Sequence, residues 1–385
     1  MNYKIMLNEA IEYAINSNYS AYNKPEEIWN RLHKAKNICL FGVGKYYRDI
    51  VNKNFFEKFF RDINPIKYVS DNNCDNCDKE YITNIKNAKF ISIDELVNLE
   101  DAIVLITVGN NRKDIQKQLD KLGVENYVFG DLYLREYDSH YSSNWFYDNK
   151  SKILEVFDML EDDKSKEIYT NVFCNRVAPH LSNKNFNDMK EENEYFNTGI
   201  FKLTDNEYIA DCGAFIGDSL EEYYKLKNGR LGGYYCFELD HNNAEICNKK
   251  IKEYNKDNII LFRVGVSNEH TFVNIDESYG TSSRINDTDE TGIMAEIVKL
   301  DDVLKGKKVS YIKMDIEGAE IAALEGAENI IKMQKPKLAI SAYHYLSDLW
   351  EIPLLIKSFN KDYKIFMRHH TADVFDTDCY AYIEE

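Results

Sequence analysis

An acid and two glycines separate an apolar segment from a helical pattern in the stretch YIADCGAFIGDSL. Asp211 is the acid, Gly213 and Gly217 are the glycines, and Asp218 begins the helical pattern. Glycine permits close backbone approach at such a turn. In a dinucleotide site this turn faces a pyrophosphate at a helix N-terminus, and an acid at position 211 would repel it. A cationic ligand fits the acid better.

Glu238 ends the next apolar segment, GGYYCFEL. In nucleotide-binding α/β folds, an acid at this place accepts hydrogen bonds from ribose hydroxyls. S-adenosylmethionine (SAM) combines a ribose with a sulfonium and an ammonium and has no phosphate, so the two acids predict a SAM site. The alternative is an ordinary strand, turn and helix, in which Asp218 caps the helix and Glu238 is a surface residue.

Candidate catalytic residues follow two later apolar segments. Asp315 ends VSYIKM and precedes Glu317 and Glu320, and His344 follows KLAISAY. Open α/β folds bind ligands where their strands end. We expect His344 to act as general base, because histidine titrates near neutrality, and we favour a functional role for Asp315 at this edge of the sheet. The three acids indicate either a divalent metal site or two glutamates that face a helix N-terminus.

Other polar and aromatic side chains of this region have two interpretations each. Tyr195 either closes the site over the cofactor or packs in the core. Arg284, in YGTSSRIND, either contacts the substrate or belongs to a polar loop. His369 and His370 end a segment whose side chains alternate between faces, and a packing or surface role is preferred for both.

Apolar segments alternate with helical patterns along most of the 385 residues. Such alternation indicates an α/β fold with mostly parallel sheets. We divide the chain into a helical lead-in (1–33), a Rossmann-like domain (34–135), a helical bridging segment (136–206) and a second α/β domain (207–385). The final segment, DCYAYIEE, is expected to form an antiparallel strand beside YKIFMRHH.

The first α/β domain has a weaker glycine turn, FGVGKYY. Tyr47 stands where a dinucleotide fingerprint has its third glycine, and Asp71 ends the following apolar segment. Gly42 and Gly44 therefore mark either a nucleotide site or a structural turn.

Composition excludes some classes of partner. The formal charge of -17 opposes binding to nucleic acid or to an anionic membrane. We expect no signal peptide and no membrane span, hence a soluble cytoplasmic protein whose eight cysteines are reduced. Cys74 and Cys77 form one CxxC without two further ligands, so solvent-facing thiols are preferred over a zinc site.

The block YIKMDIEGAEIAALEGAENII, followed by YHYLSDLWEIP, resembles the FkbM-like family of SAM-dependent methyltransferases over roughly residues 190–385. The first domain resembles Rossmann-like modules attached to polysaccharide-biosynthesis proteins. The resemblance implies a class I, seven-stranded methyltransferase domain that methylates an oxygen, often on a sugar or a sugar-derived product. Cys212 and the proline-free ELDHN depart from the family pattern. The cofactor residues that it implies are Asp211, Gly213, Ala214, Gly217 and Glu238.

Three functions remain open from the sequence. The first is O-methylation of a sugar in surface-glycan or natural-product synthesis. The second is a nicotinamide-dependent, nucleotide-sugar-modifying enzyme centred on Gly42 and Gly44, which the missing third glycine disfavours. The third is a non-catalytic binding module. The expected partner is a small-molecule or glycan substrate, and the sequence leaves the oligomeric state open.

Overall fold

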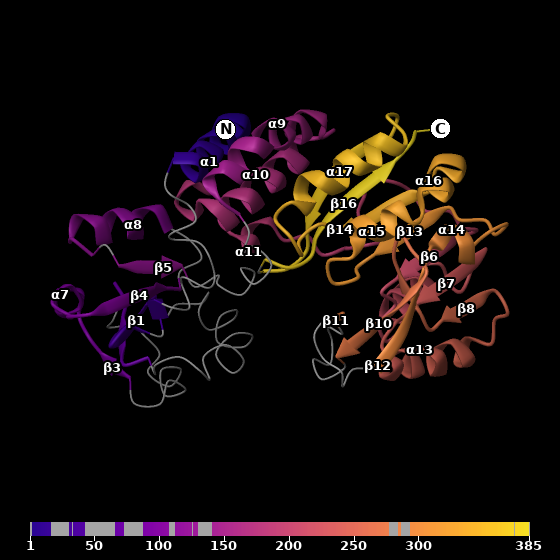
Figure 1. Cartoon of the computed structure of the whole chain (residues 1–385), viewed down its shortest axis with the longest axis horizontal. Helices are drawn as coiled ribbons and strands as arrows, with labels where there is room; N and C mark the ends of the chain where they lie inside the picture. Colours follow the sequence, from indigo (N-terminus) through magenta and orange to yellow (C-terminus); the bar gives the residue numbers. More distant parts are fainter. Residues whose placement is uncertain are drawn as a thin grey trace. The chain divides into compact units, whose positions relative to one another are not determined.

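The chain forms two compact units, each with its own largely parallel sheet (Figure 1). The first unit comprises Met1–Leu154, Glu167–Lys190 and Thr371–Val374, and the second comprises Glu155–Lys166, Glu191–His370 and Phe375–Glu385. The computed structural model describes residues 2–16, 31–32, 34–42, 66–72, 88–107, 112–124, 126–129, 141–276, 284–285, 293–372 and 374–384.

The sheet of the first unit has five parallel strands in the order β3-β2-β1-β4-β5. They are β1 (Asn37–Phe41), β2 (Tyr68–Ser70), β3 (Lys89–Phe90), β4 (Ala102–Ile106) and β5 (Tyr127–Phe129). Strands β1 and β4 are apolar throughout except for the first residue of β1, as expected of strands covered on both faces. Helices α7 (Ile93–Val97) and α8 (Arg112–Lys121) connect strands of this sheet.

Further helices lie at both ends of the first unit's sequence. They are α1 (Tyr3–Asn16), α9 (Ser143–Met159), α10 (Asp163–Val177), the 3-10 helix η4 (Pro179–Leu181) and α11 (Phe186–Met189). The Lys150–Glu12 ion pair joins α9 to α1. Residues 190–206, which the sequence placed in a helical bridging segment, form no helix.

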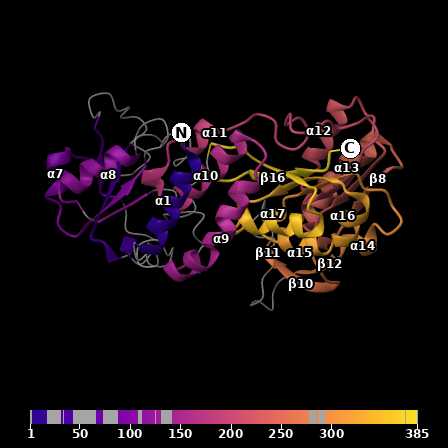
Figure 2. The same ribbon diagram turned by 90° about the horizontal axis from the view of Figure 1, so that it is seen from above.

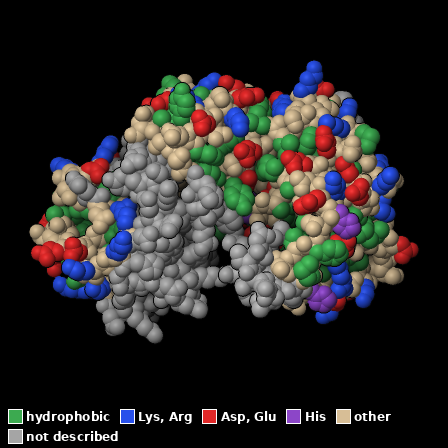
Figure 3. Space-filling model, in the orientation of Figure 1, with side chains coloured by type: hydrophobic (Ala, Val, Ile, Leu, Met, Phe, Trp, Pro, Cys, Tyr) green, Lys and Arg blue, Asp and Glu red, His purple; other side chains and the backbone are tan. Residues whose placement is uncertain are grey.

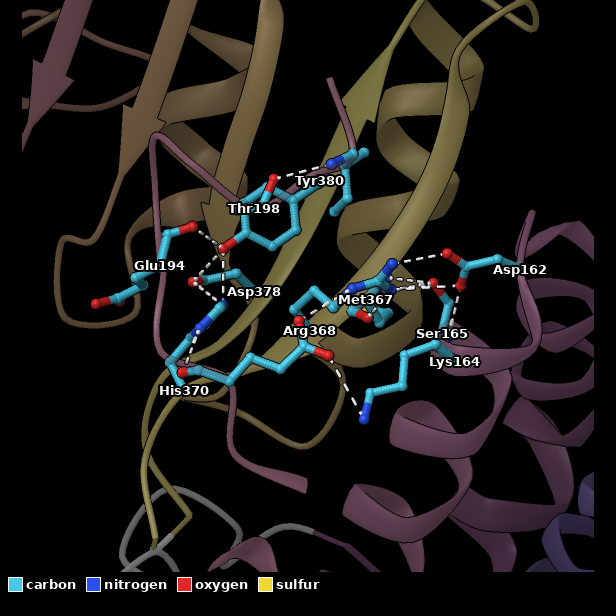
Figure 4. A network of polar contacts seen from close by, with 12 residues as sticks. Asp162, Lys164, Ser165, Glu194, Thr198, Met367, Arg368, His370, Asp378 and Tyr380 are labelled. Carbon is cyan, nitrogen blue, oxygen red and sulfur yellow. Dashed lines mark hydrogen bonds and ion pairs between the residues drawn. The ribbon is translucent and has the colours of Figure 1, made fainter. Parts of the chain in front are cut away.

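Residues 155–166, where α9 ends and α10 begins, belong to the second unit because they pack on its sheet. Leu160 makes a parallel bridge to Ile365. The Arg368 guanidinium donates two hydrogen bonds to Asp162, of 2.7 and 3.3 Å, and one to Ser165 (Figure 4). A buried arginine with these partners fixes the segment against the strand.

The sheet of the second unit runs in the order β15-β16-β14-β13-β6-β7-β8. Its strands are β6 (Tyr208–Cys212), β7 (Gly233–Phe237), β8 (Ile259–Phe262), β13 (Tyr311–Met314), β14 (Lys337–Ser341), β15 (Lys364–His369) and β16 (Thr377–Tyr382). Strand β16 is antiparallel to β14 and β15, which confirms the expected pairing of DCYAYIEE with YKIFMRHH. The other pairs are parallel, so β6, β7, β13 and β14 end at one edge.

Helices cover both faces of this sheet. Figure 2 shows α12 (Asp218–Leu226) and α13 (His241–Tyr254) on one face, and α15 (Glu320–Glu325), α16 (Glu328–Gln334) and α17 (Asp348–Phe359) on the other. Trp350 of α17 is fully buried. The helical pattern of the sequence from Ala319 to Lys332 does not form one continuous helix. It is interrupted at Gly326, where a Cβ atom would lie 1.9 Å from the Ser267 carbonyl oxygen.

A second, smaller sheet in this unit was not predicted. Its order is β11-β10-β12-β9, from β9 (Gly265–Val266), β10 (Thr271–Asp276), β11 (Arg284–Ile285) and β12 (Ile293–Val298). Phe272 and Met294 are 59% and 60% exposed. Apolar residues on the outer face obscure the alternation by which a half-buried strand is recognised.

No helix within the described ranges is both long and apolar enough to cross a membrane. On the described part of the face in Figure 3, acidic and basic side chains are interspersed rather than gathered into a basic patch. Six cysteines are buried free thiols, namely Cys39, Cys174, Cys212, Cys236, Cys247 and Cys379. Cys74 and Cys77 lie outside the described residues.

Candidate active site

The glycine turn after β6 packs against the backbone that follows β13. Gly213 has φ of +79°, and a Cβ atom there would lie 1.9 Å from the carbonyl oxygen of Asp315. The Gly213 and Ala214 amides both donate to the Phe237 carbonyl at 3.0 Å, and the Asp315 amide donates to the Cys212 carbonyl at 3.0 Å. The turn after β6 and the segment after β13 therefore share one wall, and glycine is required for that contact.

The turn ends at Gly217, in the left-handed conformation at the N-cap of α12. A Cβ atom there would lie 3.2 Å from the Cys247 sulfur. Asp218 is the exposed first residue of α12, and the cap residue makes no side-chain hydrogen bond. The alternative in which Asp218 caps the helix is therefore wrong, because the left-handed turn places a glycine at the cap.

Asp211 is fully buried and paired with a lysine of the neighbouring strand. Its Oδ1 lies 3.2 Å from the Lys313 Nζ, and its Oδ2 accepts a hydrogen bond of 2.9 Å from the Tyr234 hydroxyl. Burial raises the pKa of Asp211, while Lys313 and Tyr234 act to lower it. Burial also lowers the pKa of Lys313, but the Asp211, Asp315 and Asp218 carboxylates raise it by more. This lysine was not singled out from the sequence.

Lys313 also supports the glycine turn. Its Nζ donates a 2.7 Å hydrogen bond to the Gly213 carbonyl and lies 5.1 Å from the centre of the Tyr195 ring. One buried ammonium therefore connects the acid of β6, the turn and an aromatic residue of the site.

Glu238, directly after β7, presents a carboxylate that is already oriented. Its Oε2 accepts a 2.7 Å hydrogen bond from the Phe215 amide, and its Oε1 accepts one of 2.8 Å from the Asp240 amide. Each carboxylate oxygen has a second lone pair for a ligand. Burial raises the pKa of Glu238 to about 7, despite the two amides, which lower it. Glu238 is thus no ordinary surface residue.

Asp315 lies between two tyrosines at the end of β13. The Tyr343 hydroxyl donates to its Oδ1 at 3.0 Å, and the Tyr195 hydroxyl donates to its Oδ2 at 3.3 Å. Tyr195 is itself held through its carbonyl, which accepts a 2.6 Å hydrogen bond from Tyr311. The Asp315 side chain is 26% exposed, so it can meet a ligand.

His344 brings three acids together. Its Nδ1 lies 3.3 Å from Glu320 Oε1, and its Nε2 lies 3.6 Å from Glu317 Oε2 and 3.9 Å from Asp315 Oδ1. Burial lowers the pKa of His344, and the Glu320, Glu317 and Asp315 carboxylates raise it by more, so that it lies well above its usual range. A raised pKa favours the protonated ring. This is unfavourable for the general base expected from the sequence.

The two glutamates differ in setting. Glu317 is partly exposed and has a left-handed backbone with φ of +57°, a strained conformation that is concentrated at functional sites. Glu320 is the buried first residue of α15, and its Oε1 accepts a 2.8 Å hydrogen bond from the Ile316 amide. Asp315, Glu320 and His344 can each offer one ligand atom within 4.8 Å of the others.

A second polar group at the same edge was missed in the sequence. Tyr380 donates to the Glu194 carbonyl at 2.6 Å and lies 2.8 Å from His370 Nε2 and 3.1 Å from Asp378 Oδ2 (Figure 4). Burial and the nearby Asp315 raise the pKa of Asp378. His369 instead contacts Thr377 at 2.8 Å. Asp378 was overlooked because it is the second residue of an antiparallel strand, whereas ligand residues were sought only at the ends of parallel strands.

Some predicted residues cannot be placed. Gly44 and Tyr47 of the first turn lie outside the described residues. Arg284 belongs to β11, of which the structure describes only the backbone at this position.

The chain is similar to known methyltransferases in sequence and in fold. Residues 211–373 match the family model for the methyltransferase FkbM domain. A solved methyltransferase FkbM from Methylobacillus flagellatus KT has 22% identity, with 98% of this chain and 100% of that chain covered and a TM-score of 0.65, which supports a shared fold. No curated protein matches the chain.

Two other solved structures have a more distant likeness. An rRNA methylase from Streptococcus thermophilus has 13% identity, covers 47% of this chain and 90% of its own, and gives a TM-score of 0.31. A putative rRNA methylase from Clostridium thermocellum has 12% identity, covers 46% and 88%, and also gives 0.31. Because both TM-scores are low, we draw no conclusion about this chain from these two structures.

Proposed function

We propose that the chain, whose residues 211–373 match the methyltransferase FkbM domain, transfers a methyl group from SAM to a hydroxyl group of a sugar-containing acceptor. One observation carries the proposal. The glycine turn after β6 and the acids after β13 share a wall at Gly213 and Asp315, so a cofactor on the turn has its reactive end beside those acids.

Glu238 supports the cofactor assignment. Its two oxygens are oriented by backbone amides and keep lone pairs for the ribose hydroxyls. Asp211 is buried against Lys313, so we propose that it acts through that lysine and the turn rather than by touching the ammonium of SAM. Gly213, Ala214 and Gly217 supply the backbone surface, and the exposed Asp218 contributes negative charge at its end.

Methyl transfer requires an acceptor oxygen in line with the bond that breaks. The oxygen attacks the methyl carbon, the carbon–sulfur bond breaks, S-adenosylhomocysteine leaves, and the hydroxyl proton passes to a base. Positioning can supply much of the acceleration, with effective molarities up to about 10⁵–10⁸ M in aligned models. We further propose that the methylated atom is an oxygen and that the acceptor contains a sugar.

We assign the proton to Asp315 rather than to His344. The His344 side chain is 3% exposed and both of its ring nitrogens face carboxylates, whereas Asp315 is 26% exposed between two tyrosine hydroxyls. His344 then positions the acids around it. Tyr195 is suited to orient Asp315, to which it donates a hydrogen bond. Glu317 faces the same ring nitrogen of His344 as Asp315, and we propose that it contacts the acceptor from there.

Incubation with SAM carrying a trideuterated methyl group tests this function. Sugar acceptors that are neutral, aminated or phosphorylated are offered in parallel, and the products are read by tandem mass spectrometry. We expect the label on an oxygen of one acceptor class. Asp315→Asn should keep SAM affinity and lose at least 100-fold in turnover, and Asp302→Asn, an exposed acid of α14 (Leu300–Val303), should match the parent. Label found on nitrogen or carbon would contradict O-methylation.

The nicotinamide-dependent alternative stays a prediction, since the turn that would carry it lies largely outside the described residues. The glycan pathway and the cellular location also stay predictions.

A further inference from the structure

We propose that Asp315, Glu320 and His344 bind one divalent cation, which holds the acceptor hydroxyl beside SAM. The role of the ion in transfer rests on the proposed function. Its binding does not, because it is measurable on the chain alone.

The geometry of the three side chains suits a shared ion. One ligand atom from each residue lies within 4.8 Å of the others, and His344 Nδ1 is 3.3 Å from Glu320 Oε1. Ligand atoms bonded to one ion at about 2.0–2.2 Å lie about 3–4 Å apart. Small side-chain movements therefore complete the site.

A buried oxygen supplies an independent observation. Glu320 is 1% exposed, and its Oε2 has no hydrogen-bond partner among the residues that the structure describes. Its Oε1 accepts from the Ile316 amide, so the carboxylate is fixed with Oε2 left over. Buried polar oxygens in native proteins are paired with few exceptions, and a bound ion is one of the explanations for an exception. This oxygen distinguishes the group from an acidic cluster at the surface.

The charges of the side chains around His344 also favour a bound cation. Three carboxylates surround one imidazole, and within the described ranges none of them forms an ion pair with lysine or arginine. The nearest candidate, Lys313, is occupied by Asp211 and the Gly213 carbonyl. A divalent cation would offset two of the negative charges where partial burial makes their repulsion costly.

The surrounding hydrogen bonds orient the ligands. Tyr343 and Tyr195 donate to the two oxygens of Asp315, and the Ile316 amide donates to Glu320. Partners of this kind fix metal-ligating carboxylates, and their loss typically costs about 10–100-fold in affinity. Glu317, 3.6 Å from His344 Nε2, stands at the margin of the site.

The competing arrangement is a fixed imidazolium held between carboxylates. The three distances from its nitrogens, 3.3, 3.6 and 3.9 Å, exceed the usual range of about 2.7–3.2 Å for N–H···O hydrogen bonds. The two nitrogens face different carboxylates, Glu320 at Nδ1 and Asp315 and Glu317 at Nε2, so one nitrogen would bond to the ion and the other would keep a carboxylate partner. One nitrogen with two carboxylates favours Mn²⁺ among the ions that accept oxygen-rich sites.

Mn²⁺ binding to the full chain, stripped of metal and free of SAM, tests the site directly. Electron paramagnetic resonance measures free Mn²⁺, and titration should give one bound ion per chain. Glu320→Gln preserves the oxygen that accepts from Ile316 and should weaken binding at least 10-fold. Glu325→Gln makes the same change at an exposed position of the same helix and should bind like the parent.

Two results would overturn the inference: no bound Mn²⁺ up to millimolar concentration, as a fixed imidazolium predicts, or equal binding by the parent and Glu320→Gln. SAM titration of the same samples separates the two proposals. Mn²⁺ binding without SAM binding would contradict the methyltransferase function and leave the metal site standing. SAM binding with methylation insensitive to chelation would remove the ion's role in transfer.

Discussion

The two parallel sheets of this chain differ most in what their carboxyl edges bury. In the first unit, the described residues directly after β1 and β4 are Gly42 and Thr107, and the Thr107 hydroxyl hydrogen-bonds the Gly42 carbonyl at 2.5 Å. In the second unit, Asp211 is the last residue but one of β6, and Glu238 and Asp315 directly follow β7 and β13. The residues after β1 and β4 are neutral and buried and the acid after β2, Asp71, is partly exposed, whereas Asp211 and Glu238 are buried acids.

The topology of a sheet does not show whether it carries a reaction. The buried acids therefore indicate that the second sheet is the one that performs chemistry. A buried charge costs several kcal/mol unless it is paired, so it is unfavourable without a partner or a ligand. Asp211 has Lys313, whereas Glu238 and Glu320 have backbone amides and remaining capacity to accept. Titratable groups with perturbed pKa values gather at functional sites.

The largest effect is expected from breaking the buried pair of the second sheet. Lys313→Met leaves Asp211 charged and buried, which should cost about 3–5 kcal/mol and lower the melting temperature by about 10 °C. The first sheet supplies the control, since Lys36 and Asp101 form an exposed pair at 2.6 Å. Lys36→Met should change stability by less than about 1 kcal/mol.

Scanning calorimetry of the full chain measures both variants. Adding Asp211→Asn to Lys313→Met should restore most of the loss, because the unpaired charge is gone. Equal melting temperatures for Lys313→Met and Lys36→Met would erase the contrast between the two sheets.

The next effect concerns the wall between the turn and the acids. Gly213→Ala places a Cβ atom 1.9 Å from the Asp315 carbonyl oxygen at a φ of +79°, whereas Gly306→Ala has φ of +76° and nothing within 4 Å. Both pay about 1–2 kcal/mol for the left-handed conformation. Only Gly213→Ala should also lose more than 10-fold in SAM affinity, since its backbone must shift. Equal SAM affinities in the two variants would place the cofactor elsewhere.

A smaller effect follows from the pKa of Glu238, which burial raises to about 7. Ribose hydroxyls donate to the ionised carboxylate, so the Kd for SAM should rise about 10-fold from pH 8 to pH 6. The effect of Glu238 on the free energy of unfolding depends on pH in the opposite direction. Its contribution to stability is fully present below the pKa that it has in the unfolded chain, and it is lost as pH rises through 7.

Calorimetric titration at four values of pH checks the affinity. Glu238→Gln cannot ionise, so its weaker SAM binding should be flat over this range. If the Kd of Glu238→Gln for SAM still changes with pH, another titrating group causes the pH dependence.

The smallest effect is expected in the first sheet. Asp71, which follows β2, corresponds in position to Glu238 after β7. Asp71→Asn should leave the Kd for SAM within twofold of the parent, because the two acids belong to different units. A larger change would show that both sheets contribute to cofactor binding.

Much of the second sheet was predictable because parallel strands covered on both faces are nearly continuous apolar segments. YIADC, YIKM and KLAIS have that pattern, and the acids and the histidine after them were identified from position alone. The small sheet was missed because Phe272 and Met294 face outward. The sequence also did not reveal which side chains contact these residues, since only the fold brings Lys313 to Asp211 and Glu320 to His344.

The central claim is that SAM binds the second sheet at its charged carboxyl edge. Isothermal titration of the full chain with SAM and, separately, with NAD measures this directly, using the parent and Glu238→Ala. We predict heat with SAM, at least 10-fold weaker binding in Glu238→Ala, and no heat with NAD. Binding of NAD without SAM, or SAM binding that Glu238→Ala leaves unchanged, would contradict it.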